Sequence, residues 1–182
     1  ILPPRQKPLI GDDTTSAVIS KKIPVIVIDP GHGGIDPGST SGRIFEKHIT
    51  LAAAKEMKKH LETLGRYKVF LTRTKDMFIR LRKRRTIARN YKADLFISLH
   101  ADAIRNKNIR GLSIYTLSEK ASDREAAYLA EQENKSDLIA GIDLSIESKE
   151  VANILIDLAQ RETMNESSRL AYELVKYIRK FS

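Results

Sequence analysis

Two short apolar runs, each leading into a histidine, constrain the fold of this chain more than any other feature. Residues 23–28 form a nearly continuous β-branched run that leads through Asp-Pro-Gly into His32, and residues 94–99 lead directly into His100. Such runs, which lack alternating polar residues, are typical of strands buried on both faces, as in parallel sheets. Because the carboxyl ends of parallel strands meet at one rim, where ligands bind, we expect both histidines at that rim.

The spacing of apolar residues elsewhere predicts alternating strands and helices. The further expected strands cover residues 68–72 and 111–117, and the expected helices cover residues 46–64, 78–91, 123–133, 145–160 and 165–180, with Gly65 ending the first helix. Alternation of strands and helices implies parallel crossovers. We therefore expect an α/β fold, with a mostly parallel twisted sheet flanked by helices and an inserted helical segment in the C-terminal third. Residues 1–22 have no apolar period and are expected to be a flexible N-terminal tail or linker, followed by one domain over residues 23–182.

Composition limits the possible metal sites and partners. The 182 residues include 4 histidines and no cysteine, so a transition metal would be held by imidazole and carboxylate groups. The net charge of +9 favours an anionic partner, which could be nucleic acid, a membrane surface or a cell-wall polymer. No apolar run approaches the ~18 residues that a membrane span requires. Residues 1–22 lack the pattern of a secretory signal, so a cytosolic protein and a mature exported fragment both stay open.

The candidate metal ligands are His32, His100 and Glu46. Two glycines follow His32, and they allow the backbone to approach a ligand closely. Glu46 opens the first predicted helix, whose N-terminal end returns near the same rim, and two histidines, a carboxylate and one open position are typical of catalytic zinc. A structural hydrogen-bonding role for a loop histidine and compensation of the helix dipole by Glu46 stay open as alternatives. His48 and His60, on the same predicted helix, are expected at the surface.

Two other motifs are weaker evidence for a binding site. The glycine-rich loop around His32 lacks the lysine and hydroxyl residues of a phosphate-binding P-loop, and Asp36 stands where the third glycine of a dinucleotide fingerprint belongs. The basic run at residues 80–85 could bind nucleic acid, but it lies within a predicted helix and has no interleaved aromatic residues. We expect this run to be a solvated helix face.

Several short motifs follow one another in order along residues 23–180. They are Ile-Asp-Pro-Gly-His-Gly-Gly at 28–34, Asp-Pro-Gly at 36–38, Glu46 with Leu51, Leu-Thr-Arg at 71–73, residues 81–89, and Ser-Leu-His-Ala-Asp at 98–102. In this order they resemble the zinc-dependent N-acetylmuramoyl-L-alanine amidases of the septal cell-wall type. The resemblance implies zinc held by His32, Glu46 and His100. It also implies a periplasmic, exported hydrolase that cleaves the amide bond between N-acetylmuramic acid and L-alanine in peptidoglycan.

The resemblance has two further implications for activity. The family's general base is a glutamate on a late strand, in a segment of the type Val-Leu-Val-Glu, and this chain has no such segment. The C-terminal end of the domain is therefore expected to be missing. Septal members carry a helical insert that covers the zinc until an activator removes it, and residues 119–164 resemble that autoinhibitory insert.

The insert contains an acid that could close the metal site. Val151, Ile154, Leu155 and Leu158 form an apolar stripe with helical period, and Glu147 precedes Val151 by four residues. A buried carboxylate without a partner costs free energy, so we hypothesise that Glu147 occupies the open zinc position, with Glu150 as the second choice. The alternative, which stays open, is that Glu147 faces water at a favourable position in the first turn of its helix.

Two functional hypotheses follow. The first is a monomeric zinc amidase domain that acts on peptidoglycan in cell-wall remodelling and daughter-cell separation. It would be held inactive by its own helix and released by a protein activator, and it would have no nucleic-acid partner and no membrane span. The second is a basic binding module for an anionic polymer, with a structural metal site. Metal analysis distinguishes the two, because only the first needs a zinc ion that is lost when His32 or His100 is changed.

Overall fold

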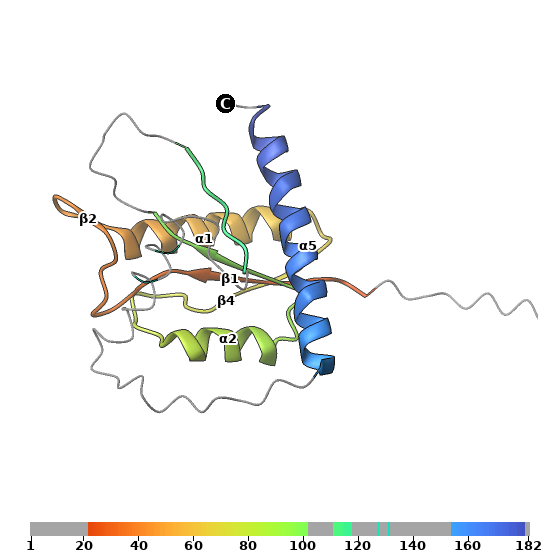
Figure 1. The fold of residues 1–182 in the computed structure, drawn as a ribbon. Coiled ribbons are helices and arrows are strands. Elements are labelled where there is room, and N and C mark those ends of the chain that lie inside the picture. Colours follow the sequence, from red (N-terminus) through yellow and green to blue (C-terminus); the bar gives the residue numbers. More distant parts are fainter. Residues whose placement is uncertain (1–21, 102–110, 118–126, 128–130, 132–153, 181–182) are drawn as a thin grey trace, which may run out of the picture.

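A three-stranded parallel sheet forms the centre of the molecule (Figure 1). The computed structural model describes residues 22–101, 111–117, 127, 131 and 154–180. The strands are β1 (Val25–Pro30), β4 (Lys68–Leu71) and β5 (Leu95–Leu99), in the order β4-β1-β5. Each strand lies within two or three residues of its expected position, which confirms the parallel α/β arrangement.

Strand β1 lies between its two partners and is the most buried strand. Its residue Val27 pairs with Phe70 of β4 on one side and with Phe96 of β5 on the other. All of its residues except Val25 are buried, as expected for a β-branched run in a parallel sheet. The loop that carries His32 therefore extends from the best-supported strand of the sheet.

Helices cover both faces of the sheet (Figure 1). Helix α1 (Glu46–Thr63) packs on one face and helix α2 (Leu81–Asn90) on the other. Gly65 ends α1 as expected, in the left-handed conformation with φ 65° and with its N–H donated to the Glu62 carbonyl at 3.0 Å. The apolar core lies between the sheet and α1. It contains Ile26, Ile28, Ala54 and Val69, with Met57, Leu61, Tyr67, Leu71, Leu95, Ile97 and Leu99 partly buried against them.

The face under α2 is smaller and combines aromatic contact with charge. The ring of Phe70 stacks on that of Tyr91, with the ring centroids 3.9 Å apart. Ala88 of α2 is also buried, and one turn earlier the helix buries Arg84. This face of the sheet therefore contains a charged residue beneath the strand that leads to His32.

Three expectations are wrong or incomplete. Residues 111–117 form no strand, because alternating apolar residues supply propensity but a strand also needs a neighbour to complete its ladder, and these residues pair with no described strand. The expected break between helices 145–160 and 165–180 is absent, since helix α5 (Ile154–Ile178) continues through it without meeting Gly or Pro. The antiparallel pair β2 (Thr40–Ser41) and β3 (Ile44–Phe45) was not expected.

The C-terminal third is described only in part. The expected helix at residues 123–133 lies mostly outside the described residues, and so does the segment 145–153. Among the helices that are described, none has both the length and the apolar character to cross a membrane.

Candidate metal centre

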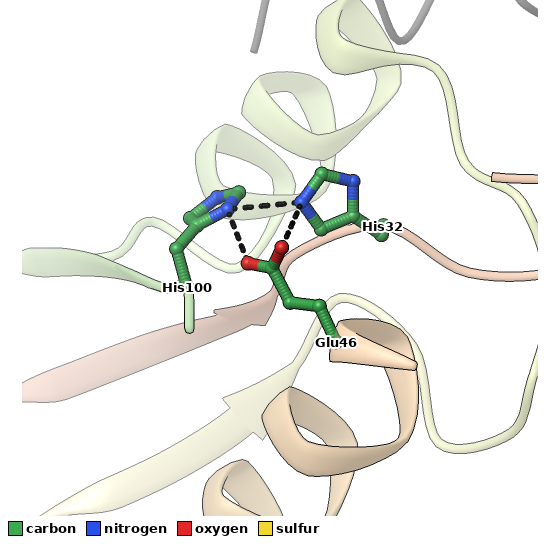
Figure 2. A group of neighbouring side chains, drawn as sticks. All are labelled: His32, Glu46 and His100. Carbon is green, nitrogen blue, oxygen red and sulfur yellow. Dashed lines mark hydrogen bonds and ion pairs between the residues drawn. The ribbon is translucent and has the colours of Figure 1, made fainter. Parts of the chain in front are cut away.

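The side chains of His32, Glu46 and His100 converge at the rim formed by the carboxyl ends of β1 and β5 (Figure 2). His32 lies two residues beyond β1, Glu46 is the first residue of α1, and His100 follows β5 directly. The Nε2 atom of His32 is 3.2 Å from Oε2 of Glu46, and Nδ1 of His100 is 3.2 Å from Oε1. The same two nitrogens are 3.2 Å from each other. The structure thus brings together the three residues that the sequence predicts as ligands.

This geometry fits a single metal ion. A tetrahedral ion with bonds of about 2.0–2.2 Å separates its ligand atoms by roughly 3.3 Å, close to the spacing found here. Two imidazole nitrogens and a carboxylate oxygen are donors that suit zinc and other first-row transition metals. The side chains of His32 and Glu46 are 8% and 1% exposed, whereas that of His100 is 27% exposed, so the cluster opens towards solvent beside His100.

The charges in the cluster favour a cation. Burial alone would lower the pKa of His32, but hydrogen bonds and charge from the Asp36 and Glu46 carboxylates outweigh burial and raise it to about 10. Burial opposes ionisation of Glu46, yet hydrogen bonds from His100, His32 and two backbone N–H groups hold its pKa well below the usual range. Two ionised carboxylates therefore surround the His32 imidazole, and a bound metal ion can take the place of the proton.

Backbone N–H groups fix both oxygens of Glu46. Oε2 accepts a hydrogen bond from Ser39 N at 2.8 Å and Oε1 accepts one from Ala101 N at 2.7 Å. Ala101 directly follows His100, so this bond also joins the end of β5 to the start of α1. The N-terminal end of a helix favours a negative side chain, which further stabilises the carboxylate at this position.

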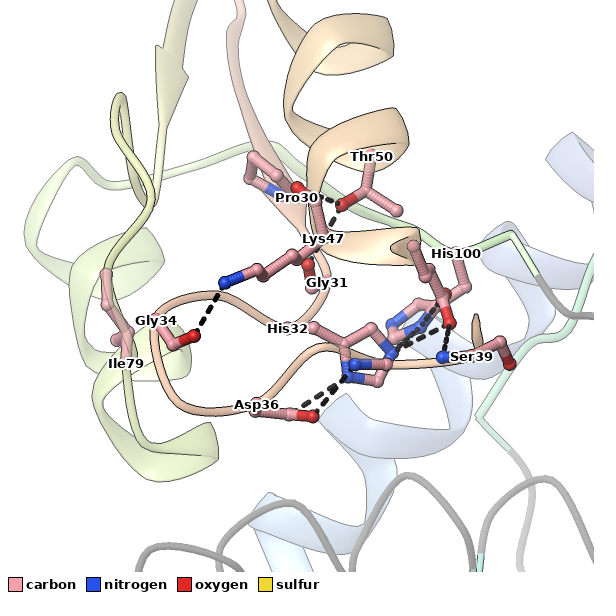
Figure 3. A network of polar contacts seen from close by, with 12 residues as sticks. Pro30, Gly31, His32, Gly34, Asp36, Ser39, Lys47, Thr50, Ile79 and His100 are labelled. Atoms are coloured by element: carbon pink, nitrogen blue, oxygen red, sulfur yellow. Dashed lines mark hydrogen bonds and ion pairs between the residues drawn. The ribbon is translucent and has the colours of Figure 1, made fainter. Parts of the chain in front are cut away.

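The backbone of His32 has an unusual conformation. Its φ of 59° lies in the left-handed region, which residues other than glycine seldom adopt. A bridge between Gly33 and Asp36 closes the turn, with Gly33 N donated to Asp36 O at 2.9 Å. The Asp36 carboxylate then holds Nδ1 of His32 at 2.9 Å (Figure 3), which directs Nε2 towards Glu46 (Figure 2). Orientation of a ligand histidine by a carboxylate is a frequent feature of metal sites.

Glycines leave room for both imidazoles. A Cβ atom added to Gly31 would lie 2.5 Å from Cε1 of His100. A Cβ on Gly38, whose φ is 66°, would lie 2.5 Å from Cδ2 of His32 and 2.7 Å from Oε2 of Glu46. The glycine-rich loop is therefore packed directly against the three candidate ligands.

Arg84 supports the loop from below. The guanidinium donates to Oδ1 of Asp29 at 2.9 Å, to the Pro30 carbonyl at 2.8 Å and to the His32 carbonyl at 2.9 Å. Thr72 and Ser98 also donate to the Asp29 carboxylate. Arg84 is only 4% exposed, so the expectation of a wholly solvated basic face at residues 80–85 is wrong for this residue. The carbonyls offset the cost of burying the charge, and their positions depend on tertiary structure.

Arg73 supports the same loop from the other side. It is 2% exposed and donates to the carbonyls of Pro30 at 2.9 Å, Gly31 at 2.8 Å and Lys47 at 2.9 Å. The bond to Lys47 joins the loop to the first turn of α1. Two arginines thus bind three consecutive backbone carbonyls at the base of the His32 loop.

Lys47 and Asp76 add a more exposed support, and Figure 3 shows the contact between Lys47 and Gly34. Lys47 Nζ donates to the Gly34 carbonyl at 2.7 Å and to Oδ2 of Asp76 at 2.8 Å. Gly34 N in turn donates to Oδ1 of Asp76 at 2.6 Å. These bonds hold the outer part of the loop to α1.

Sequence reasoning missed the residues that support the ligands. Asp36 was noted as a departure from a nucleotide-binding motif and as part of the Asp-Pro-Gly motif, but no role at the metal was given to it, although an acid four residues after a loop histidine is itself a signal. Arg84 precedes Ala88 by one helical turn, and this spacing could have indicated the buried face. His48 and His60 are exposed, as expected. Glu147 and Glu150 lie outside the described residues.

Comparison with known proteins identifies the family. Residues 26–181 match the family model of N-acetylmuramoyl-L-alanine amidases. The chain belongs to this family. The amidase AmiC of Neisseria meningitidis is 43% identical over 149 residues, which cover 81% of this chain and 35% of that protein. AmiA of Escherichia coli K12 is 40% identical over 157 residues, which cover 85% of this chain and 54% of that protein.

Solved structures of amidases also match in part. The catalytic domain of CwlV from Bacillus (Paenibacillus) polymyxa var. colistinus aligns with a TM-score of 0.43 and 38% identity, over 46% of this chain and 48% of that one. The chain spans about a third to a half of the length of the curated amidases it matches. Membership in the amidase family favours the enzyme hypothesis over the basic binding module.

Proposed function

We propose that this chain is the catalytic domain of a zinc-dependent amidase that cleaves peptidoglycan between N-acetylmuramic acid and L-alanine. The observation that carries the proposal is the cluster of His32, Glu46 and His100 in a chain of the amidase family, with ligand atoms 3.2 Å apart. A bound zinc ion would lower the pKa of a water towards ~7 and polarise the scissile carbonyl.

The residues of the chain supply position and charge. His32 binds through Nε2, because its Nδ1 is held by Asp36. Glu46 contributes a carboxylate whose oxygens are already directed by two backbone N–H groups. The substrate amide approaches from the side of His100, which is the exposed side of the cluster.

Metal content and product analysis together test this proposal. We expect one zinc per chain, lost in His32→Ala and in His100→Ala and retained in His60→Ala, an exposed histidine on α1. Digestion of purified peptidoglycan should release new L-alanine amino termini, and a chelator should abolish the release until zinc is restored. The amidase assignment would be contradicted if the zinc-loaded protein released no such termini, both as the chain given and in a version extended at its C-terminus.

We propose that the general base is a glutamate in a segment of the type Val-Leu-Val-Glu, which these 182 residues do not contain. The assay therefore compares the chain as given with a version extended at its C-terminus by the late strand of a family member. We expect hydrolysis only by the extended version. Equal hydrolysis by both versions would show that the base lies within the present sequence.

Autoinhibition is a second part of the proposal. We propose that residues 119–164 cover the metal and that Glu147, or as second choice Glu150, occupies its open position. The support is the alignment of Glu147 with an apolar stripe in the sequence. Glu147→Ala in the extended version should raise basal peptidoglycan hydrolysis, and Asp157→Ala, about 110° from the centre of the stripe around the helix, should not. Unchanged basal hydrolysis in both glutamate variants, Glu147→Ala and Glu150→Ala, would exclude the mechanism.

The setting that follows is the bacterial envelope. We propose that the protein is exported to the periplasm and acts as a monomer in daughter-cell separation, after a protein activator displaces the inhibitory helix. Cells that lack the protein should then form chains, and expression of an exported form should separate them. Separation restored by a form retained in the cytoplasm would contradict this location.

A further inference from the structure

Helix α2 has two unlike faces. Arg84 and Ala88 point inward and are 4% and 8% exposed. On the outer side, Arg82, Arg85 and Arg89 recur at spacings of three and four residues, and all three are exposed. With 3.6 residues per turn, they lie within about 60° of arc and extend over roughly 10 Å of the helix. We call these three residues the arginine stripe.

Within the part of the chain that the structure describes, the arginine stripe has no neutralising partners. Helix α2 contains no acidic residue, and among the residues that the structure describes no ion pair or hydrogen bond involves a stripe side chain. Helix α1 differs, because its Lys47 pairs with Asp76 and its Lys58 pairs with Glu62. Like charges three and four residues apart destabilise a helix. The stripe therefore opposes the stability of the fold, whereas Arg84 on the inner face supports it.

The stripe begins beside the candidate metal centre. Arg84, in the first turn of α2, donates to the His32 carbonyl at 2.9 Å, and its Nε donates to the Ile79 carbonyl at 2.8 Å, just before the helix. The start of α2 therefore lies against the His32 loop, and the helix leads away from it (Figure 1). A ligand that extends along α2 can reach the rim where the three candidate ligands meet.

We propose that the arginine stripe binds the carboxylate groups of peptidoglycan while the scissile amide lies at the metal centre. The inference rests on the proposed function and names a surface that recognises its substrate. Peptidoglycan stem peptides carry several free carboxylates, and guanidinium groups bind carboxylates through paired hydrogen bonds. Repeated, unpaired arginines on one helix face match a polymer whose acidic groups repeat. The stripe holds the polymer and takes no part in bond cleavage.

The test measures binding of the zinc-loaded protein to purified, insoluble peptidoglycan by sedimentation at several salt concentrations. The variant is R82Q/R85Q/R89Q. The matched control is K55Q/K59Q/R66Q, which removes three exposed positive charges on and just after α1. We expect at least tenfold weaker binding and a shallower salt dependence for the stripe variant, and less than twofold weakening for the control. Equal weakening of binding in the stripe variant and in the control would show that binding depends only on net charge, and this would overturn the proposal.

A second measurement identifies the ligand chemistry. In this measurement the carboxyl groups of peptidoglycan are converted to amides. The unaltered protein should bind this amidated polymer as weakly as the stripe variant binds native peptidoglycan. Unreduced binding to the amidated polymer would overturn the proposal. So would equal, stripe-dependent affinity for duplex DNA or for vesicles of anionic phospholipid.

A structural role for the stripe makes a different prediction. If the stripe only binds carboxylates, R82Q/R85Q/R89Q should unfold at the same temperature as the unaltered protein or above it, because repulsion is removed, and it should retain its zinc. A lower unfolding temperature with loss of zinc would overturn the proposal. Failure of the proposed function would appear separately, as stripe-dependent binding to peptidoglycan by the version extended at its C-terminus, without release of L-alanine amino termini.

Discussion

The ends of β1 and β5 each present a histidine to the same rim, but the chain supports the two loops differently. His32 is 8% exposed at its side chain, has a left-handed backbone and is held by Asp36 at Nδ1 and by Arg84 at its carbonyl. The side chain of His100 is 27% exposed, and its ring packs closely against Gly31, which has no side chain. The difference indicates a division of roles. The β1 side fixes the geometry of the centre, and the β5 side leaves it accessible.

Replacement of Arg84 should have the largest effect on the β1 side. Arg84→Met leaves Asp29 buried without its cationic partner, and we expect the free energy of unfolding to fall by about 3–5 kcal/mol, measured by urea denaturation of the metal-free protein. Arg84→Lys should retain part of this stability, because an ammonium group keeps the charge without the planar set of donors.

Arg85→Met is the matched control, since Arg85 is exposed on the same helix. It should change the free energy of unfolding by less than about 0.5 kcal/mol. A loss below 1 kcal/mol in Arg84→Met would show that the guanidinium does not hold the loop, and the contrast between the two strand ends would then disappear.

Asp36→Asn sharpens the comparison at the level of the metal. The amide cannot supply the charge that now orients His32, and we expect zinc affinity to fall about 10–100-fold, measured by competition with a chelator. Asp76→Asn, which removes a carboxylate from the outer part of the same site, should change zinc affinity less than threefold. Equal losses in the two variants would mean that general negative charge, and not the bond to His32, determines affinity.

Gly31→Ala tests the opposite side of the centre. The added methyl group would press on the His100 ring, and because this side chain is partly exposed and can turn, we expect a loss of about 1 kcal/mol, near the lower limit for overpacking. Zinc affinity should fall about fivefold. Gly38→Ala should cost more, since its φ of 66° adds backbone strain and its Cβ meets His32 and Glu46. Unaltered zinc binding in Gly31→Ala would show that His100 does not depend on the close packing.

The smallest effect is expected at Asp76. Hydrogen bonds from Lys47 and from Gly34 N lower the pKa of this carboxyl below its ordinary value of 3.8. Because the folded pKa is depressed, the group stabilises the fold above about pH 4 and loses this contribution as the pH falls through the folded pKa. Its side chain is 40% exposed, so the contribution should not exceed about 1 kcal/mol. The difference in the free energy of unfolding between the unaltered protein and Asp76→Asn should be larger at pH 7 than at pH 3.

Sequence patterns predicted most of the fold and the three candidate ligands. The β-branched run of β1 and the helical period of α1 are local signals, and parallel strand ends share a rim by geometry, so His32, His100 and Glu46 could be assigned together. The supports of His32 could be predicted only in part. The spacing of Arg84 and Ala88 indicates an inward helix face, but the burial of Arg84 is favourable only because folding brings close the carbonyls of a loop some 50 residues earlier.

The two wrong expectations about secondary structure have a similar cause. Residues 111–117 alternate as a strand would, but strand formation depends on a partner that no local pattern reveals. The break expected near residue 162 depended on the end of an apolar stripe. A helix continues wherever the backbone allows, and α5 meets neither Gly nor Pro there.

The central position of β1 has a consequence for how this molecule opens. Its backbone is hydrogen-bonded along both edges, to β4 and to β5, and its side chains are almost wholly buried. Amide hydrogens in residues 26–29 should therefore exchange with solvent only when the whole sheet opens, while those near the ends of α1 exchange through local fraying. The His32 loop is joined to the slowest-opening segment of the described chain, so the candidate metal centre should keep its shape through most local fluctuations.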